Sequence, residues 1–432
     1  MKYIIIIFFL VESAMAQPVA TSSFNVDGIK VIYKPTLKNI VNISVYFRGG
    51  VTNYTGEKAG IEKLAVEAAV ECGNAKYSKD DFKDKSDLFG IELTEGASLD
   101  NAKIGLNCLT KYFNEGWDLL AEAVTEPIYN ENAFEKLKQK TIGLLKQSEG
   151  NPDYRLRTMA VQNAFAGTSY AINPDGTEST LASITAAEAK DYYFKTLLNK
   201  SRIFIVVVGN IPKEEITAKI SAAFASVPTL GYQPHVTEAP KFFHNTVNVE
   251  ERSIATNYII GIMNAPAYTS PDFMPYRLAI SELHGWLFYE IRTKRNLSYA
   301  PDAGVHDLLL PYSYVYVSTT NPEAAVEVMT NVINNEQQSS IARKSLDEIK
   351  ALYITGSYRR DESTDAIADN LGMSEVLGNW EIAEQMPEMV RKTTRNEMSR
   401  VFKKYITGIR WTYLGDKQKA DEAMHSFNMK VK

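Results

Sequence analysis

The chain has 432 residues, of which 45% are hydrophobic and 23% charged. This composition is typical of a globular protein and excludes the fibrous and disordered classes, and the length allows two to four domains with cores of their own. The formal net charge is -5, and no stretch is rich in Lys and Arg. The sequence therefore predicts no basic surface for a phosphate backbone, which argues against nucleic acid as a partner.

The first residues have the pattern of a secretory signal peptide. Lys2 precedes an apolar run over 4–11, and Ala14-Met15-Ala16 supplies the small residues of a cleavage site. We expect cleavage after Ala16 and a mature protein that is periplasmic or secreted. The run is far shorter than the roughly 20 apolar residues that a membrane span needs. No later segment reaches that length, so no membrane span is predicted.

The first half of the chain alternates between strand and helix patterns. Alternating apolar residues predict strands over 25–34, with a turn at Asp27-Gly28, and over 42–47, and we expect these two segments to form an antiparallel pair. A helix from 61 should end at Gly73, and a second helix should begin at the N-cap Ser78 and stop at Gly90. Further strands are expected over 91–98, 103–109 and 203–208, and further helices around Trp117 and over 132–147, 185–198 and up to about 225.

The second half repeats the first. Glycine and proline mark a linker over 228–242, after which strand patterns return over 247–249, 257–263, 299–305, 313–318 and 409–414, with helix patterns between them. The strand 204–208 ends in Gly209-Asn210 and the last strand in Gly415-Asp416, which indicates an internal duplication. We predict an α+β fold with two homologous lobes in a clam-shell arrangement, each a mainly antiparallel sheet with helices packed on one face. The predicted divisions are a signal peptide (1–16), an N-terminal lobe (17–227), the linker (228–242) and a C-terminal lobe (243–432).

The stretch 287–299 carries the first candidate site. Leu287 and Ile291 fit the last turns of a helix with a buried face, and the residues around Tyr299 open an extended run, so Arg292 and Tyr299 should flank a helix-to-strand turn. A guanidinium and a phenol held side by side can donate hydrogen bonds to a peptide carbonyl or to an oxyanion. The alternative is an Arg at a helix C-terminus, where its charge suits the dipole, and a Tyr packed in a sheet. The spacing alone favours this alternative.

Several short motifs together resemble the pitrilysin/insulinase-like zinc peptidase family, in its short two-lobe bacterial form related to processing peptidase subunits. The resemblance covers essentially the whole mature chain. Its motifs are Phe47-Arg48-Gly49-Gly50 leading to Gly60-Ile61, then Gly73, Tyr77-Ser78, Phe89-Gly90, Glu126-Pro127, the strand end at Gly209 and the stretch from Arg292 to Tyr299. The second lobe of that family carries an Arg and a Tyr at this spacing that hold the substrate backbone. The resemblance thus implies that Arg292 and Tyr299 orient the substrate and stabilise an oxyanion.

The first lobe departs from the family at the zinc motif. Active members carry His-x-x-Glu-His, and here Lys63 and Glu67 stand at the two His positions and Val66 at the Glu position. The further Glu ligand should fall near 143–145, where the chain has no carboxylate. We therefore predict no metal in this chain, and we expect Lys63 and Glu67 to form an i,i+4 ion pair on a core helix.

Metal chemistry leads to the same expectation without the family. A hydrolytic zinc site takes about three N or O ligands from the protein and a water. Every histidine lies in or after the predicted linker, and no two are spaced to bind a metal from one helix face: His235, His244, His284, His306 and His425. The two cysteines, Cys72 and Cys108, are too few for a disulfide framework, and the sequence leaves open whether they pair or are two buried thiols.

These features lead to two functional hypotheses. The first is the non-zinc subunit of a secreted, heterodimeric pitrilysin-like metallopeptidase, which is inactive alone. It would bind the substrate peptide and supply Arg292 and Tyr299 to the zinc site of a homologous partner that carries the zinc motif. The alternative is a non-enzymatic peptide-binding or scaffold protein of the same fold. An autonomous zinc peptidase with unusual ligands is the least favoured interpretation.

Overall fold

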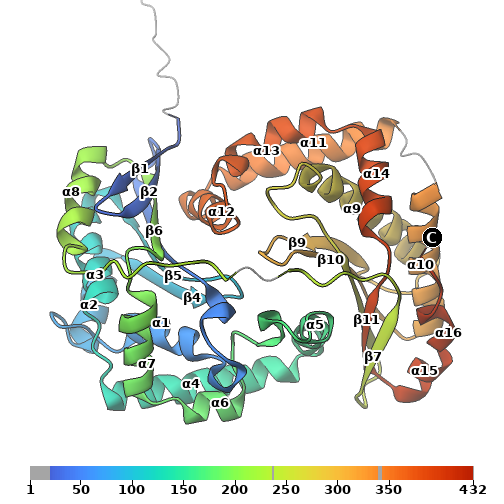
Figure 1. Cartoon of the computed structure of the whole chain (residues 1–432), viewed down its shortest axis with the longest axis horizontal. Coiled ribbons are helices and arrows are strands. Elements are labelled where there is room, and N and C mark those ends of the chain that lie inside the picture. Colours follow the sequence, from blue (N-terminus) through green and yellow to red (C-terminus); the bar gives the residue numbers. More distant parts are fainter. Residues whose placement is uncertain (1–19, 236–237, 339–342, 432) are drawn as a thin grey trace, which may run out of the picture.

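The computed structural model describes residues 20–235, 238–338 and 343–431 and contains two lobes, each built on one β-sheet (Figure 1). This confirms the predicted α+β, two-lobe fold. The predicted signal peptide and residues 236–237 of the predicted linker lie outside the described residues. None of the helices in the described part of the chain combines the length and the hydropathy that a bilayer-spanning helix requires.

The first sheet has six strands in the order β1-β2-β6-β3-β5-β4. Its strands are β1 (Ser22–Val26), β2 (Ile29–Pro35), β3 (Ile40–Arg48), β4 (Glu92–Ala97), β5 (Asn101–Leu109) and β6 (Ile203–Gly209). β1 and β2 form a hairpin whose two turn residues, Asp27 and Gly28, have φ of 47° and 94°. Positive φ at both positions is what a two-residue turn of type I′ requires.

The expected pairing of segment 25–34 with segment 42–47 is wrong. β6 lies between them, parallel to β2 and antiparallel to β3. All seven residues of β6 are buried, and alternate residues face two different hydrophobic clusters. A strand that is apolar on both faces is suited to the centre of a covered sheet, and this explains why a segment so distant in sequence separates β2 from β3.

The second sheet repeats this topology with five strands in the order β7-β11-β8-β10-β9. β11 is parallel to β7 and antiparallel to β8, just as β6 is to β2 and β3. The strands are β7 (Thr246–Glu251), β8 (Asn257–Asn264), β9 (Asp302–His306), β10 (Tyr312–Thr319) and β11 (Arg410–Gly415). The equivalent position of β6 and β11 confirms the duplication inferred from their sequences.

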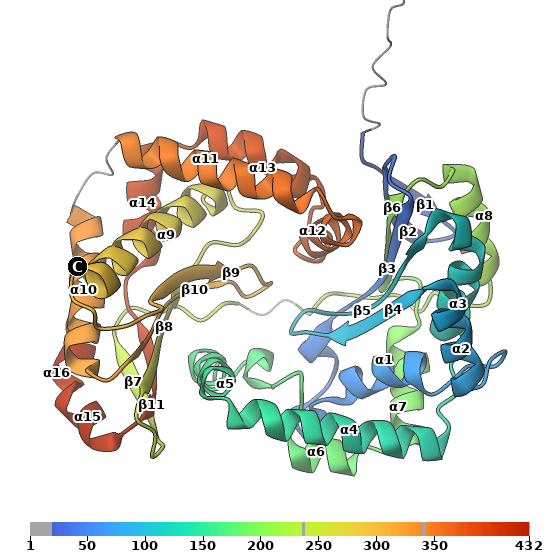
Figure 2. The ribbon, with the colours of Figure 1, turned by 180° about the vertical axis from the view of Figure 1, so that it is seen from behind.

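Most helices of each lobe lie outside its sheet, on the face away from the other lobe (Figures 1 and 2). Those of the first lobe are α1 (Ile61–Glu71), α2 (Lys79–Phe89), α3 (Phe113–Thr125), α4 (Glu131–Gly150), α6 (Glu178–Ser183), α7 (Ala186–Tyr192) and α8 (Lys213–Ala223). The predicted caps of α2 are confirmed. The Ser78 side chain accepts a hydrogen bond from the Asp81 backbone N–H, and the backbone of Gly90 has the left-handed conformation of a C-cap. Cys72 and Cys108 are buried and unpaired.

The second lobe is covered in the same way. Its helices are α9 (Phe273–Leu287), α10 (Pro322–Gln338), α11 (Arg343–Arg360), α13 (Glu381–Lys392), α14 (Arg395–Tyr405), α15 (Lys417–Glu422) and α16 (Met424–Phe427). The sequence did not predict α13, which carries Pro387 in its interior. A proline usually breaks a helix pattern, because it has no N–H to donate and its ring clashes with the preceding turn.

The two lobes exchange a helix. α5 (Pro152–Ala164) of the first lobe packs on β8 and β11 of the second sheet, and α12 (Thr364–Val376) of the second lobe packs on β3 and β6 of the first (Figures 1 and 2). Because β3 and β6 are the equivalents of β8 and β11, the exchange is reciprocal. Each sheet is therefore covered on its inner face by a helix that the other lobe supplies.

The contact of α12 with the first sheet is close and partly ionic. The rings of Tyr46 and Phe204 stack at 4.8 Å, and a Cβ atom on Gly372 would lie 2.3 Å from the Tyr46 ring. Only glycine lets the helix approach this near. The buried carboxylate of Glu375 accepts hydrogen bonds from Arg48 at 2.6 Å and from Lys30 at 2.8 Å.

The contact of α5 with the second sheet also combines apolar and polar groups. Phe165 packs against the rings of Phe242 and Tyr312, at 6.4 and 5.7 Å between ring centres. Near the other end of the helix, Arg155 donates to Glu250 of β7 at 2.5 Å. The contacts of α5 and α12 thus each combine buried aromatic groups with ion pairs, in two separate hydrophobic clusters.

Candidate functional site

Arg292 and Tyr299 lie against one another at the end of α9. The α-helix ends at Leu287 and continues as a π-helix, Phe288–Thr293. Asn296, with φ of 52°, reverses the chain, and the Leu297 N–H donates to the Ile291 carbonyl at 2.9 Å. The guanidinium carbon of Arg292 then lies 4.0 Å from the centre of the Tyr299 ring. The structure thus brings together the two side chains that the sequence singled out.

The Tyr299 side chain lies in the turn and not in a sheet. β9 begins at Asp302, three residues later than predicted, and 78% of Tyr299 is exposed. Pro301 precedes the strand, and a proline has no N–H to donate to a strand ladder. The alternative of a tyrosine packed in a sheet is therefore wrong.

The polar atoms of both side chains remain available. Within the described ranges, neither the Arg292 guanidinium nor the Tyr299 hydroxyl has a hydrogen-bond or ion-pair partner. Stacking on the Tyr299 and Phe288 rings, the latter at 4.9 Å, orients the guanidinium without using its donors. Chemically, the pair can donate hydrogen bonds to a carbonyl oxygen or an oxyanion. That it does so on a peptide stays a prediction.

The degenerate zinc-motif positions lie on α1. The Lys63 ammonium is 2.6 Å from Asp175 and 4.0 Å from Glu67, so the predicted i,i+4 pair is present but is not the closest contact. The Thr141 hydroxyl of α4 donates to Glu67 at 2.9 Å. Leu144 and Leu145, in the stretch 143–145 where we expected the further ligand to fall, line the same pocket as Glu67 and Thr141 and have no carboxylate. Val66 is fully buried in the core.

These side chains do not fit zinc. A catalytic zinc needs about three neutral-nitrogen, thiolate or carboxylate ligands. Here Val66 offers no donor, Lys63 is held by Asp175, and only Glu67 stands at a ligand position with a carboxylate. Burial raises the pKa of Glu67, and the neighbouring Lys63 opposes this increase. In the described part of the chain, no group of three His, Cys, Asp or Glu side chains is placed to hold a metal.

Asp175 and Glu62 complete this region, and sequence reasoning missed both. Asp175 is 112 residues from Lys63 and comes from the loop before α6, so no local pattern connects the two residues. The Glu62 carboxylate is fully buried at the start of α1, where it accepts from Tyr192 at 2.5 Å and from Asn53 at 2.9 Å. Its other oxygen, Oε1, has no hydrogen-bond partner among the described residues.

Glu62 makes stability depend on pH. Burial raises its pKa to about 7, although the hydrogen bonds from Tyr192 and Asn53 act in the opposite direction. The native state therefore holds this proton more tightly than the unfolded chain, whose carboxyl has a pKa near 4.5. It follows that the free energy of unfolding falls as the pH rises from about 4.5 to 7.

We expect Glu62→Gln to remove part of this fall. When the pH changes from 4.5 to 8, the free energy of unfolding of the variant should increase relative to that of the wild type by on the order of 1 to 3 kcal/mol. Urea unfolding at the two pH values measures the difference, and Glu57→Gln, an exposed position nearby, is the matched control. Identical pH dependence in Glu62→Gln and the wild type would contradict the assignment.

Comparison with known proteins gives matches to peptidase M16 proteins over part of the chain. The family model of the peptidase M16 inactive domain matches residues 183–353. In sequence the chain is similar to the non-peptidase homolog YmxG of Helicobacter pylori (strain ATCC 700392 / 26695), with 26% identity over 215 residues, which are 49% of this chain and 49% of that protein. The chain is an M16-like protein that lacks the zinc motif. This M16-like chain spans about half the length of the relatives that it matches in sequence.

Solved structures agree with the fold of the M16-like chain. The peptidase M16 inactive domain of Pseudomonas fluorescens superimposes with a TM-score of 0.83 at 18% identity, covering 92% of this chain and 98% of that one. The periplasmic protease PqqL of Escherichia coli superimposes with a TM-score of 0.77 at 14% identity, covering 91% of this chain but 46% of that one. At such identities these structures establish the fold alone.

Proposed function

We propose that this M16-like chain is the non-zinc subunit of a secreted, heterodimeric metallopeptidase. The observation that carries the proposal is the Arg292–Tyr299 pair, whose hydrogen-bond donors have no partner among the described residues, with Tyr299 exposed and Arg292 half-buried. In the same chain, ion pairs and an apolar side chain occupy the positions of the zinc motif. Arg292 and Tyr299 supply donors to the substrate at the zinc site of a homologous partner that has an intact motif, and the signal peptide directs the chain to the periplasm or out of the cell.

A free sheet edge supports peptide binding by this chain. β4 stands at the edge of the first sheet and, among the described residues, pairs only with β5. An exposed edge strand can accept an extended peptide through backbone hydrogen bonds. Glu95 on β4 has a pKa raised to about 7 by burial and by the charges of Glu71 and Glu67. These three carboxylates outnumber the two neighbouring cations, Lys63 and Lys140, and the excess negative charge favours peptides with basic side chains at the edge.

A non-enzymatic peptide-binding or scaffold role is the second candidate. It is favoured by the similarity to a relative named a non-peptidase homolog, and the β4 edge needs no chemistry in order to capture a peptide. The two candidates differ in whether Arg292 and Tyr299 take part in a reaction.

Reconstitution distinguishes the candidates. We would assay peptide hydrolysis by the purified mature chain, by a homologous chain with an intact His-x-x-Glu-His from the same genome, and by their mixture. Zinc content would be measured by mass spectrometry. The proposal expects no zinc and no hydrolysis with this chain alone, and zinc-dependent hydrolysis in the mixture. Stoichiometric zinc and hydrolysis by this chain alone would refute it, and peptide binding without hydrolysis in the mixture would establish the second role.

A further inference from the structure

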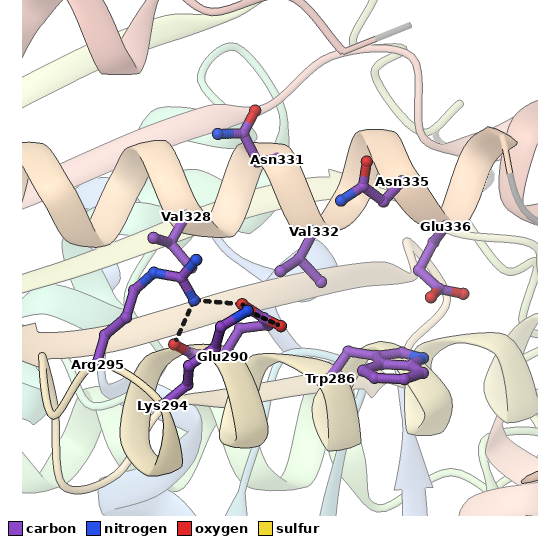
Figure 3. Close-up of a pocket in the computed structure, with 9 residues that line it drawn as sticks. All are labelled: Trp286, Glu290, Lys294, Arg295, Val328, Asn331, Val332, Asn335 and Glu336. Atoms are coloured by element: carbon purple, nitrogen blue, oxygen red, sulfur yellow. Dashed lines mark hydrogen bonds and ion pairs between the residues drawn. The ribbon is translucent and has the colours of Figure 1, made fainter.

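A pocket of about 450 Å³ lies between the end of α9 and α10, on the second lobe (Figure 3). From the α9 side it is lined by Trp286, Glu290 and Lys294, which recur every four residues and so share one side of the helix. Arg292 does not line it. The pocket is therefore distinct from the Arg292–Tyr299 pair, and its volume is in the range of small-ligand sites.

One end of the pocket is cationic. Glu290 accepts hydrogen bonds from the Lys294 ammonium at 3.2 Å and from the Arg295 guanidinium, and the Glu290 backbone carbonyl accepts from Arg295 at 2.9 Å. Figure 3 shows these three side chains together at one end of the gap between the helices. Two cations and one carboxylate leave a net positive charge there, which suits an anionic group of a ligand.

The other end is anionic and aromatic. Glu336 projects from α10 toward the helix that carries Trp286 (Figure 3), and no described residue forms an ion pair or a hydrogen bond with its carboxylate. Burial raises the pKa of Glu336 to about 7, and no cation among the described residues opposes the increase. The Trp286 ring at the same end is 43% exposed. A carboxylate beside the face of an indole ring is a favourable setting for an organic cation.

We propose that this pocket binds a short peptide fragment with free termini, such as a dipeptide. The terminal carboxylate lies at the Arg295 and Lys294 end, and the α-ammonium lies between the Glu336 carboxylate and the Trp286 ring. Val332 of α10 lines the wall between the two ends, with Val328 beside Arg295 at the cationic end (Figure 3), and both contact the apolar part of the ligand. The inference does not rest on the peptidase role, because the pocket needs no partner subunit.

Charge separation is what selects this ligand class. A dianion would meet Glu336 and Glu290, and a simple cation would leave the net positive charge of the Arg295 end unmatched. A zwitterion with an apolar middle satisfies both ends and the Val332 wall at once. The formal charges of the pocket residues also balance, because Glu290 and Glu336 are carboxylates and Lys294 and Arg295 are cations.

Tryptophan fluorescence reports directly on the pocket. The chain has four tryptophans, and three of them are at least 91% buried: Trp117, Trp380 and Trp411. The full chain would be titrated with the dipeptide Ala-Val, with N-acetyl-Ala-Val and with Ala-Val amide, and the same mixtures would be measured by calorimetry. We expect a saturable change with Ala-Val. Each capped form, which lacks one of the two terminal charges, should bind about tenfold or more weakly.

Two variants and a matched control test the roles of the ends. Glu336→Gln should weaken Ala-Val about tenfold and abolish the preference for Ala-Val over its N-acetyl form. Arg295→Gln should weaken Ala-Val about tenfold and abolish the preference for Ala-Val over Ala-Val amide. Glu327→Gln makes the same chemical change on the exposed side of α10, outside the pocket, and should leave binding unchanged.

The proposal is wrong under any of three results. These are the absence of saturable binding of Ala-Val by both methods, equal affinity for the free and capped peptides, and unchanged discrimination in Glu336→Gln. Circular dichroism of the variants separates these results from misfolding, and a misfolded Glu336→Gln would be replaced by Glu336→Asp, which keeps the charge but withdraws it from the ring.

Discussion

Replacing Arg292 by Ala should lower kcat/KM of the reconstituted subunit pair about 10²- to 10³-fold, the loss typical of removing one oxyanion donor. The Arg292 guanidinium stacks on the Tyr299 ring at 4.0 Å and on the Phe288 ring at 4.9 Å, and it has no hydrogen-bond or ion-pair partner among the described residues. An exposed cation–π contact is worth only about 0.5 to 1 kcal/mol. The loss of activity should therefore occur with little loss of stability. Tyr299→Phe should act in the same direction, because it removes only the hydroxyl donor.

Two controls show whether the effect belongs to this site. Arg359→Ala makes the same chemical change at an exposed position of α11, and Tyr289→Phe does so at an exposed tyrosine within the π-helix. Both should leave kcat/KM unchanged. Full turnover in Arg292→Ala and Tyr299→Phe, with normal assembly of the two subunits, would remove this pair from the mechanism.

Glu375→Ala should destabilise the chain by about 3 kcal/mol, at the low end of the cost of breaking a buried ion pair. Glu375 is the carboxylate of α12 that receives Arg48 and Lys30 from the first sheet, and its side chain is 6% exposed. Its loss leaves two cations without a counter-charge at the lobe interface. Because Lys30 is 40% and Arg48 26% exposed, both regain some water, and this keeps the cost from being larger. Urea unfolding followed by circular dichroism measures the change.

Glu384→Ala is the matched control for this prediction. Glu384 also pairs across the lobes, with Lys34 at 3.0 Å, but its side chain is 38% exposed. Exposed pairs contribute roughly 0 to 1 kcal/mol, so this variant should unfold close to the wild type. Equal destabilisation by the two substitutions would mean that burial does not determine the strength of the Glu375 pairs.

Features set by short stretches of sequence could be predicted. The Ser78 and Gly90 caps of α2 and the turn at Asp27-Gly28 depend on residues within a few positions of one another. Arg292 and Tyr299 are seven residues apart, so one helix end and one turn suffice to bring them together. Their close approach therefore followed from local patterns, although the start of β9 was misplaced.

Features set by long-range packing could not be predicted. The continuous apolar run shows that β6 is a strand but not that it separates β2 from β3, because every strand of a buried sheet presents similar apolar faces. Lys63 and Asp175 meet only through the packing of α1 against the loop before α6, and nothing near either residue in the sequence marks the contact. The same holds for α12, whose apolar side does not reveal which of the two sheets it covers.

The exchange of α5 and α12 bears on how a duplicated chain of this kind arises. One lobe by itself leaves the inner face of its sheet bare and presents a helix with nothing to cover. Two copies of such a lobe can associate through a symmetric contact, in which the helix of each copy packs on the sheet of the other. Joining the copies in one chain makes that association intramolecular and so independent of protein concentration. Once joined, the two halves are free to diverge, and one can lose a metal site while the paired architecture is kept.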